Sequence, residues 1–184
     1  MIAEEEAAEA RRCAREMFVQ AGILLRPEEL DSIFVEDFGL GEFEAIGLAI
    51  LQTADTAAIN IRILAMLPNQ LCPEHRHMPQ GEYAGKEETF RSQWGEVYLY
   101  MPGAATPEPK ARPPTHRRAY FTSWHEIVLG PGGQHTSPPD TRHWFQAGPE
   151  GAVMWTFCSR VAIGADSFTD PQITGLTCGL QQEG

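Results

Sequence analysis

The sequence has few features that indicate export or a membrane. Only four cysteines occur in 184 residues and none forms a CxxC pair, so without an export signal we expect free thiols. The first ten residues, MIAEEEAAEA, carry acids where a signal peptide requires positive charge. The longest apolar runs, such as AIGLAIL, are far shorter than the ~20 residues of a membrane span. We therefore expect a cytoplasmic protein without a membrane partner.

Positive charge is also scarce. Fourteen lysines and arginines stand against 25 acidic residues, which gives a net charge of −11, and the basic residues are scattered along the chain. Nucleic-acid binding depends on clustered basic side chains that displace counterions from phosphates. The composition therefore excludes a nucleic-acid partner, while the length suits one domain with its own core.

Helical periodicity is confined to the start of the chain. Residues 4–20, EEEAAEARRCAREMFVQ, combine strong helix formers with apolar residues at helical spacing, and Gly22 stands where a C-terminal cap is expected. RPEELDSI predicts a second, short helix that opens at Pro27. We expect residues 1–33 to pack as a helical segment on a barrel formed by residues 34–184, within a single domain.

After this segment the apolar period changes to two. INIRILAML (59–67) places Ile61 and Ile63 on one strand face and Asn60 and Arg62 on the other. Further short strands are predicted at ETFRSQW, EVYLYM, HEIVLG, TRHWFQA and AVMWTFCS, which are bounded by glycine and proline turns. This pattern favours an all-β sandwich or barrel. The proline-rich residues 102–119 are predicted to form an exposed loop or an edge that covers the barrel mouth.

The stretch CPEHRH contains the strongest chemical signal. On a strand, His75 and His77 share a face. Glu88 follows on the next element, and Lys86, two residues before it, lies on the same face as Glu88. Two imidazoles and a carboxylate suit a divalent ion that keeps open positions for a substrate. A fourth ligand is expected from a later strand, and His143 behind a Pro-Pro-Asp-Thr turn is the best candidate, in competition with His125 and His135. Cys72 is interpreted as a small buried apolar residue.

These motifs resemble one protein family along most of the chain. CPEHRH, GKEETFR, GEVYLYMPG, WHEIVLGPGGQHTSPPDTRHWFQAG and FTDP are similar to the D-lyxose isomerase family of cupins, from about residue 38 to Ile173. The resemblance implies a cupin-type double-stranded β-helix (jelly-roll) barrel with an N-terminal helix. It also implies a divalent metal, usually Mn²⁺, with the ligands His75, His77, Glu88 and His143. The same ligand types suit Fe²⁺, Co²⁺, Ni²⁺ and Zn²⁺.

Two positions depart from the family pattern. Thr156 stands where the family carries a glutamate used in proton transfer, and Arg62 stands where it carries a lysine, whereas Lys86 matches a family lysine. A threonine hydroxyl has no useful proton affinity near neutral pH. A base for proton transfer would then be Glu88, Glu87, a neutral Lys86 or a hydroxide on the ion.

We therefore predict a metal-dependent aldose–ketose isomerase that converts D-lyxose to D-xylulose, with D-mannose to D-fructose as a related reaction, through a metal-stabilised enediolate. The predicted catalytic residues are Lys86 and Glu88, and the predicted substrate-binding residues are Arg62, Trp144, Phe145 and Thr156. The alternative is a metal-dependent cupin that binds a sugar but turns it over weakly or not at all. An Fe²⁺ oxygenase has no support beyond the ligand types. We expect a monosaccharide as ligand and a homodimer as the default assembly of this fold.

Overall fold

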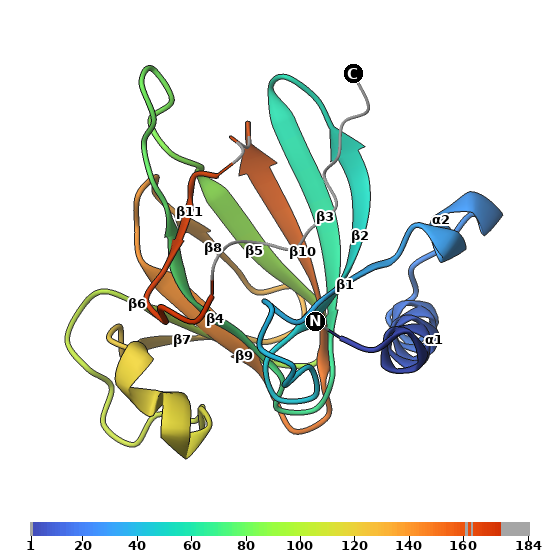
Figure 1. Ribbon diagram of the computed structural model, residues 1–184, viewed down its shortest axis with the longest axis horizontal. Helices are drawn as coiled ribbons and strands as arrows, with labels where there is room; N and C mark the ends of the chain where they lie inside the picture. Colours follow the sequence, from blue (N-terminus) through green and yellow to red (C-terminus); the bar gives the residue numbers. More distant parts are fainter. Residues whose placement is uncertain (1, 161, 163, 174–184) are drawn as a thin grey trace.

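The computed structural model describes residues 2–160, 162 and 164–173, and within them two antiparallel sheets face each other (Figure 1). Sheet A has the order β1 (Phe34–Glu36), β2 (Leu48–Asp55), β3 (Ile59–Met66), β10 (Ala152–Ser159), β5 (Glu88–Trp94) and β8 (Gln134–Ser137). Sheet B has the order β11 (Asp166–Phe168), β4 (Leu71–His77), β9 (His143–Ala147), β6 (Val97–Met101) and β7 (His125–Leu129). The predicted mainly-β architecture is confirmed.

Strand β3 shows how the alternating pattern sorts side chains between two cores. Leu64 and Met66 point between the sheets and join the main core, whereas Ile63 and Ala65 point outward into a second core. The strand and both of its predicted faces are therefore confirmed. The same alternation also directs Arg62, which stands two residues before Leu64, toward the space between the sheets.

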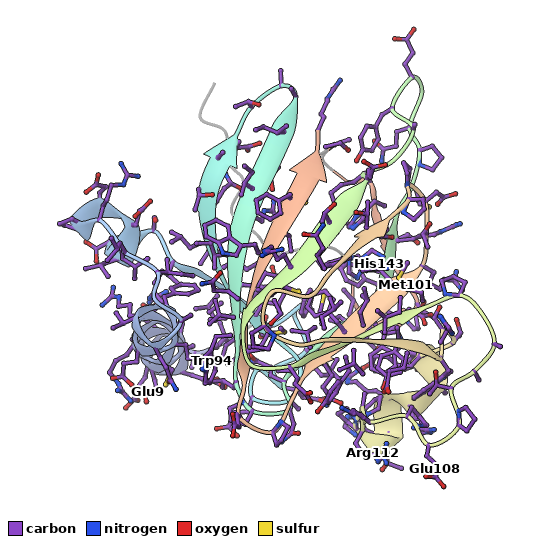
Figure 2. The ribbon with its side chains drawn as sticks, turned by 180° about the vertical axis from the view of Figure 1, so that it is seen from behind. Glu9, Trp94, Met101, Glu108, Arg112 and His143 are labelled. Atoms are coloured by element: carbon purple, nitrogen blue, oxygen red, sulfur yellow. The ribbon has the colours of Figure 1, made fainter. Side chains whose placement is uncertain are left out.

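The second core lies under the N-terminal helix α1 (Glu4–Gln20), whose predicted bounds are confirmed. A short helix, α2 (Pro27–Asp31), follows where it is predicted. Phe18 of α1 is fully buried against Leu51 and Val153 on the outer face of sheet A. Figure 2 places Trp94 beside α1, and this side chain packs on the same cluster. Neither helix of the described residues is long and apolar enough to cross a membrane.

Most of the proline-rich segment is an exposed loop, as one of the two predictions states, but it lies at the back of sheet B, which corrects the alternative of an edge over the barrel mouth. It contains a 3₁₀ helix, η1 (Thr115–Tyr120), next to β7 and β9 (Figure 1). Phe121, which follows η1, is buried. Its ring centroid lies 4.6 Å from that of Trp144 on the outer face of β9. The Trp144 indole Nε1 donates to the carbonyl of Ser123 at 2.7 Å. The apolar rings on this outer face are what the loop buries.

The cysteines are free thiols wherever the structure describes them. Cys72 and Cys158 are buried, and Cys13 is half-buried on α1. The fourth cysteine, Cys178, lies outside the described residues.

We expect Phe18→Ala to lower the free energy of unfolding by ~3–5 kcal/mol, because it removes a fully buried ring and leaves a cavity between α1 and sheet A. Urea unfolding followed by circular dichroism measures the change. Val19→Ala on the same helix is the control, since Val19 is 69% exposed and should change stability by less than ~0.5 kcal/mol. Equal effects of the two substitutions would show that α1 does not pack on the sheet as described.

Candidate metal centre

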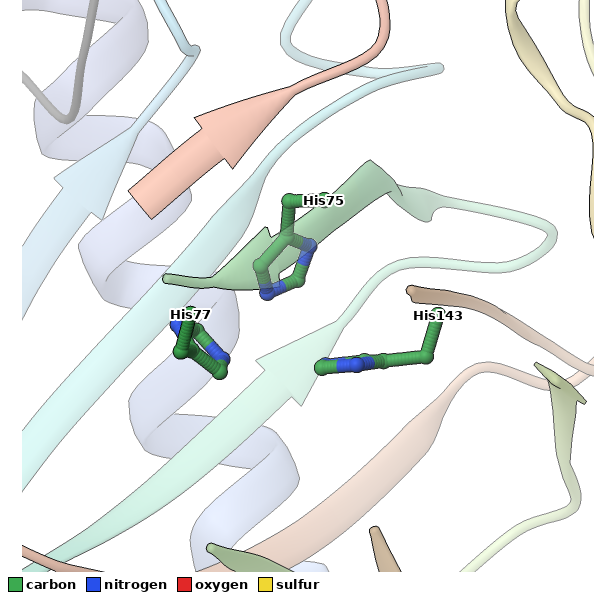
Figure 3. Close-up of side chains that lie close together, drawn as sticks. All are labelled: His75, His77 and His143. Carbon is green, nitrogen blue, oxygen red and sulfur yellow. The ribbon is translucent and has the colours of Figure 1, made fainter. Parts of the chain in front are cut away.

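Three histidines converge inside the barrel from two neighbouring strands of sheet B. His75 and His77 lie on β4, and His143 lies on β9 directly opposite His75 in the antiparallel register. All three are buried, and one ring nitrogen from each lies within 4.8 Å of the others. Figure 3 shows the three rings turned toward a common point. The prediction that His75 and His77 share a strand face is confirmed by this geometry.

Backbone carbonyls set the tautomers of two of these rings. Nδ1 of His75 lies 2.8 Å from the carbonyl oxygen of Pro73, and Nδ1 of His143 lies 2.9 Å from that of Thr141. Because a carbonyl oxygen only accepts, each Nδ1 carries the hydrogen and each Nε2 keeps its lone pair. The His143 Nε2 is buried without a hydrogen-bond partner. A buried, unpaired nitrogen of this kind fits a metal ligand.

The third ring is held by a carboxylate. Asp166 on β11 lies opposite His77 in the register, and its Oδ1 makes a short hydrogen bond with the His77 Nδ1. A carboxylate behind a histidine fixes the orientation of the ring and makes its other nitrogen a stronger ligand. Asp166 is not among the predicted site residues, because 89 residues separate it from His77 and no local motif marks it.

A lysine–glutamate pair faces the histidines from sheet A. The Glu88 Oε2, at the start of β5, lies 3.1 Å from Nε2 of His77 and 3.7 Å from Nε2 of His143. The Lys86 Nζ lies 3.0 Å from the same oxygen. The second oxygen, Oε1, accepts a weak hydrogen bond from the Cys158 thiol at 3.4 Å. The structure thus brings together all four predicted metal ligands and both predicted catalytic residues.

Burial makes two of the imidazoles neutral. Loss of solvent and the neighbouring His77 lower the pKa of His75 to about 4. The same loss of solvent, together with His75, holds the pKa of His143 well below its usual value. Since both pKa values fall, both rings are uncharged at neutral pH, which is the state that binds a metal ion.

The carboxylate and the lysine keep their charges despite burial. Burial alone would raise the pKa of Glu88, but the charge of Lys86 and the hydrogen bond from His77 outweigh it and hold the pKa well below its usual value. Burial alone would lower the pKa of Lys86, but the charge of Glu88 outweighs it and raises the pKa. The hypothesis of a neutral Lys86 is therefore not supported by its surroundings in this structure.

Other predicted site residues divide between the cavity and the rest of the protein. Arg62, Phe145 and Thr156 line the cavity together with His75, His77, Lys86, Glu88 and Asp166. Trp144 does not line it, because side chains alternate along β9 and its ring stacks on Tyr100 outside the barrel, with centroids 4.0 Å apart. The prediction of Trp144 as a substrate contact is therefore corrected.

The competing histidines lie elsewhere. His125 and His135 line a separate surface groove at the edge between β7 and β8, and neither belongs to the buried cluster. Cys72 lines the cavity, but its Sγ is 4.0 Å from Nδ1 of His75, the nitrogen that faces away from the convergence point. This arrangement agrees with a buried small side chain rather than a ligand.

The residues present fit a divalent ion. Three imidazoles from sheet B and one ionised carboxylate from sheet A form a mixed nitrogen and oxygen donor set, which suits Mn²⁺ and its neighbours in the first transition row. Two facing antiparallel sheets with this centre between them define a cupin-type double-stranded β-helix barrel.

Comparison with known proteins defines the family. The chain is 51% identical to a D-lyxose ketol-isomerase of Thermofilum sp. (strain ex4484_79), over 94% of this chain and 96% of the relative. It is 44% identical, with the same coverage, to a D-lyxose/D-mannose isomerase of Thermosediminibacter oceani (strain ATCC BAA-1034 / DSM 16646 / JW/IW-1228P). The chain therefore belongs to the D-lyxose ketol-isomerase family, and it is an aldose–ketose isomerase of sugars.

Solved structures agree on the fold. An L-ribose isomerase of Cellulomonas parahominis, solved with L-ribose, superposes with a TM-score of 0.78 at 14% identity, over 95% of this chain and 96% of that one. The L-ribose isomerase of Geodermatophilus obscurus superposes with a TM-score of 0.77 at 14% identity, over 94% of each chain. No family model matches the sequence.

We expect Asp166→Ala to weaken Mn²⁺ binding by about 10–100-fold, because His77 loses the carboxylate that orients it. Asp166→Asn keeps an acceptor oxygen for the Nδ1–H of His77, so it should weaken Mn²⁺ binding less than Asp166→Ala does. Isothermal titration calorimetry on metal-stripped protein measures the affinity. Glu87→Gln is the control, since Glu87 is an exposed carboxylate next to Glu88. An unchanged Mn²⁺ affinity in Asp166→Ala would show that Asp166 does not support the metal site.

Proposed function

We propose that this protein is a divalent-metal-dependent isomerase that interconverts D-lyxose and D-xylulose, with D-mannose and D-fructose as a second pair. The observation that carries the proposal is the convergence of three buried imidazoles and Glu88 on one point of the cavity. The substrate is supported by relatives of nearly the same length that are named for D-lyxose and D-mannose.

The proposed ligands are His75, His77, Glu88 and His143, and Mn²⁺ is the proposed ion. When bound by these residues, a divalent ion would polarise the sugar carbonyl and stabilise developing negative charge, which is worth several kcal/mol in the transition state. The surrounding residues exclude bulk water, because the donors themselves are buried.

Lys86 and Glu88 are the proposed proton-transfer residues. Lys86 is charged, buried and within 3.0 Å of Glu88, so its ammonium can donate a hydrogen bond or a proton to a sugar oxygen beside it. The Glu88 Oε1 receives only a thiol hydrogen, which is a weak donor, so it is the freer oxygen to accept the carbon-bound proton. Glu87 is exposed and faces away from the cavity, and Thr156 has no basic group.

A low catalytic rate has specific support. The pKa of Glu88 lies well below its usual value, and a weak base removes a carbon-bound proton slowly. Thr156 supplies a hydroxyl for substrate contact in the cavity, with Arg62 and Phe145 as further proposed contacts. We therefore keep slow turnover of a tightly positioned sugar as the second candidate. The predicted homodimer and the cytoplasmic location stay predictions.

We expect metal-stripped protein to convert no D-lyxose, and Mn²⁺ to restore formation of D-xylulose, because the bound ion would supply the charge that polarises the carbonyl and stabilises the developing oxyanion. Liquid chromatography of the sugars measures conversion, with D-mannose in a parallel series and Co²⁺, Ni²⁺ and Zn²⁺ as alternative ions. Full activity after complete removal of metal would contradict metal dependence. Absence of product from both sugars in the Mn²⁺-loaded protein would contradict the substrate.

We expect Lys86→Met to lower kcat by about 10²–10⁴-fold, the usual cost of losing a positioned acid or base. The variant should bind Mn²⁺ at least as tightly as the native protein, because a buried positive charge near the ligands is removed. Steady-state kinetics and a separate Mn²⁺ titration distinguish the two effects. A kcat within threefold of the native value would exclude Lys86 from proton transfer.

A further inference from the structure

Helix α1 covers only part of the outer face of sheet A. Leu51 and Ile63 lie under the helix and are buried. Farther along the strands, Phe157 on β10 is 40% exposed and Ile59 on β3 is 45% exposed. In Figure 1 the upper parts of β3 and β10 rise clear of α1. The Phe157 ring also stacks on that of Trp155, with centroids 5.9 Å apart, so an apolar surface stands open beside the helix.

The strand registers arrange this face in rows that contain no acidic residue. The row nearer α1 consists of Leu51, Ile63, Trp155, Arg91 and Gln134, and the next row consists of Ala54, Ile61, Phe157, Thr89 and Thr136. Two copies of a protein with a net charge of −11 repel each other. They can come into close contact only where acidic side chains are sparse, and these rows provide such a surface.

The polar side chains in the two rows already bind one another. The hydroxyls of Thr89 and Thr136 lie 2.8 Å apart, and Nη1 of Arg91 donates to Oε1 of Gln134 at 3.0 Å. Because these groups have partners within the face, covering it would leave few polar atoms unpaired. A pleated surface of this kind packs well against a second sheet, at a distance of about 10 Å.

The charges along one strand identify the partner as a second copy of the same chain. Glu87, Thr89 and Arg91 alternate onto the same outer face, with Thr89 midway between the two charges. Glu87 is exposed, and its backbone N–H donates to Oγ of Ser159 on β10 at 3.0 Å. A two-fold axis beside Thr89 would bring Arg91 of each copy to Glu87 of the partner subunit. A symmetric contact repeats such a pair, once on each side of the axis.

We propose that the outer face of β3, β10 and β5 is the contact surface between two copies of this chain, with Phe157 near its centre. The proposal does not rest on the proposed function, because none of the residues in the two rows lines the cavity. The contact lies directly behind the candidate site, since Phe157 and Thr89 are the strand neighbours of Cys158 and Glu88. A second copy would therefore support the strands that carry these two side chains.

Sedimentation equilibrium of the full-length protein over a range of concentrations tests this contact. We expect the native protein to have twice the mass of one chain. Phe157→Asp should raise the dissociation constant of the dimer by about 100-fold or more, because the two-fold axis would bring like charges together in an apolar contact. Val128→Asp is the matched control, since Val128 is a 42% exposed strand residue on β7 of the other sheet, and should change the constant by less than about threefold.

A native protein that stays monomeric at every concentration would overturn the proposal. A Phe157→Asp variant that associates as tightly as the native protein would overturn it too, because the contact would then lie elsewhere. Circular dichroism of both variants, measured in the same samples, shows whether the fold is kept.

A charge exchange tests the two-fold arrangement without altering the apolar centre. Arg91→Glu should weaken the dimer by about 10-fold or more, because it would face Glu87 of the partner subunit. Adding Glu87→Arg to the same chain should recover most of the lost affinity. Both side chains are exposed, so these variants remain informative if Phe157→Asp fails to fold. A double variant that associates no better than Arg91→Glu alone would exclude the proposed contact.

Discussion

Strand β4 pairs with two strands at once, and the candidate site depends on both registers. Pairing with β9 sets His75 opposite His143, and pairing with β11 sets His77 opposite Asp166. Because side chains alternate along a strand, a slip of one residue in either pairing would turn a histidine away from the barrel interior. The positions of the candidate ligands are therefore set more by the backbone hydrogen bonds between strands than by side-chain packing.

The outer face of β4 is anchored as firmly as its inner face. Glu74, which is 1% exposed, accepts hydrogen bonds from the backbone and hydroxyl of Thr122, from the backbone of Ser123 and from the hydroxyl of Thr169. One carboxylate thus joins β4 to the residues between η1 and β7 and to the chain after β11. Such a buried carboxylate is stable only when all its acceptor positions are used. The loop behind the sheet consequently supports the histidines in front of it.

Inside the barrel, buried charged groups lie close to one another. Lys86 offsets Glu88, and Asp166 faces His77, so most of the buried charge has a partner at close range. Arg62 also lines this cavity, and its Nε has no hydrogen-bond partner among the described residues. Groups that a ligand must satisfy are commonly left unpaired in the free protein, and they lower its stability to gain binding specificity.

Much of this arrangement could be read from local patterns. The period of two along INIRILAML separates Leu64 from Ile63 and puts Asn60 and Arg62 together, and the HxH spacing puts His75 beside His77. Helix α1 follows from helix formers and a 3.6-residue period. The strands β1, β2, β8 and β11 were not predicted. Strands β1, β8 and β11 have only three or four residues, and β2 begins with a continuous buried run that shows no alternation.

The sequence by itself thus determined the mainly-β class, the helix at the start, the two faces of residues 59–67, the shared face of His75 and His77 and the residue types of the metal centre, because these depend on side-chain periodicity over a few residues. Tertiary structure alone decided that Asp166 holds His77, that Trp144 faces outward into a covering loop and that the orphaned atoms of Asn60 and Arg62 are buried. Those facts depend on registers between strands that lie far apart in the chain, and no local pattern encodes such pairings.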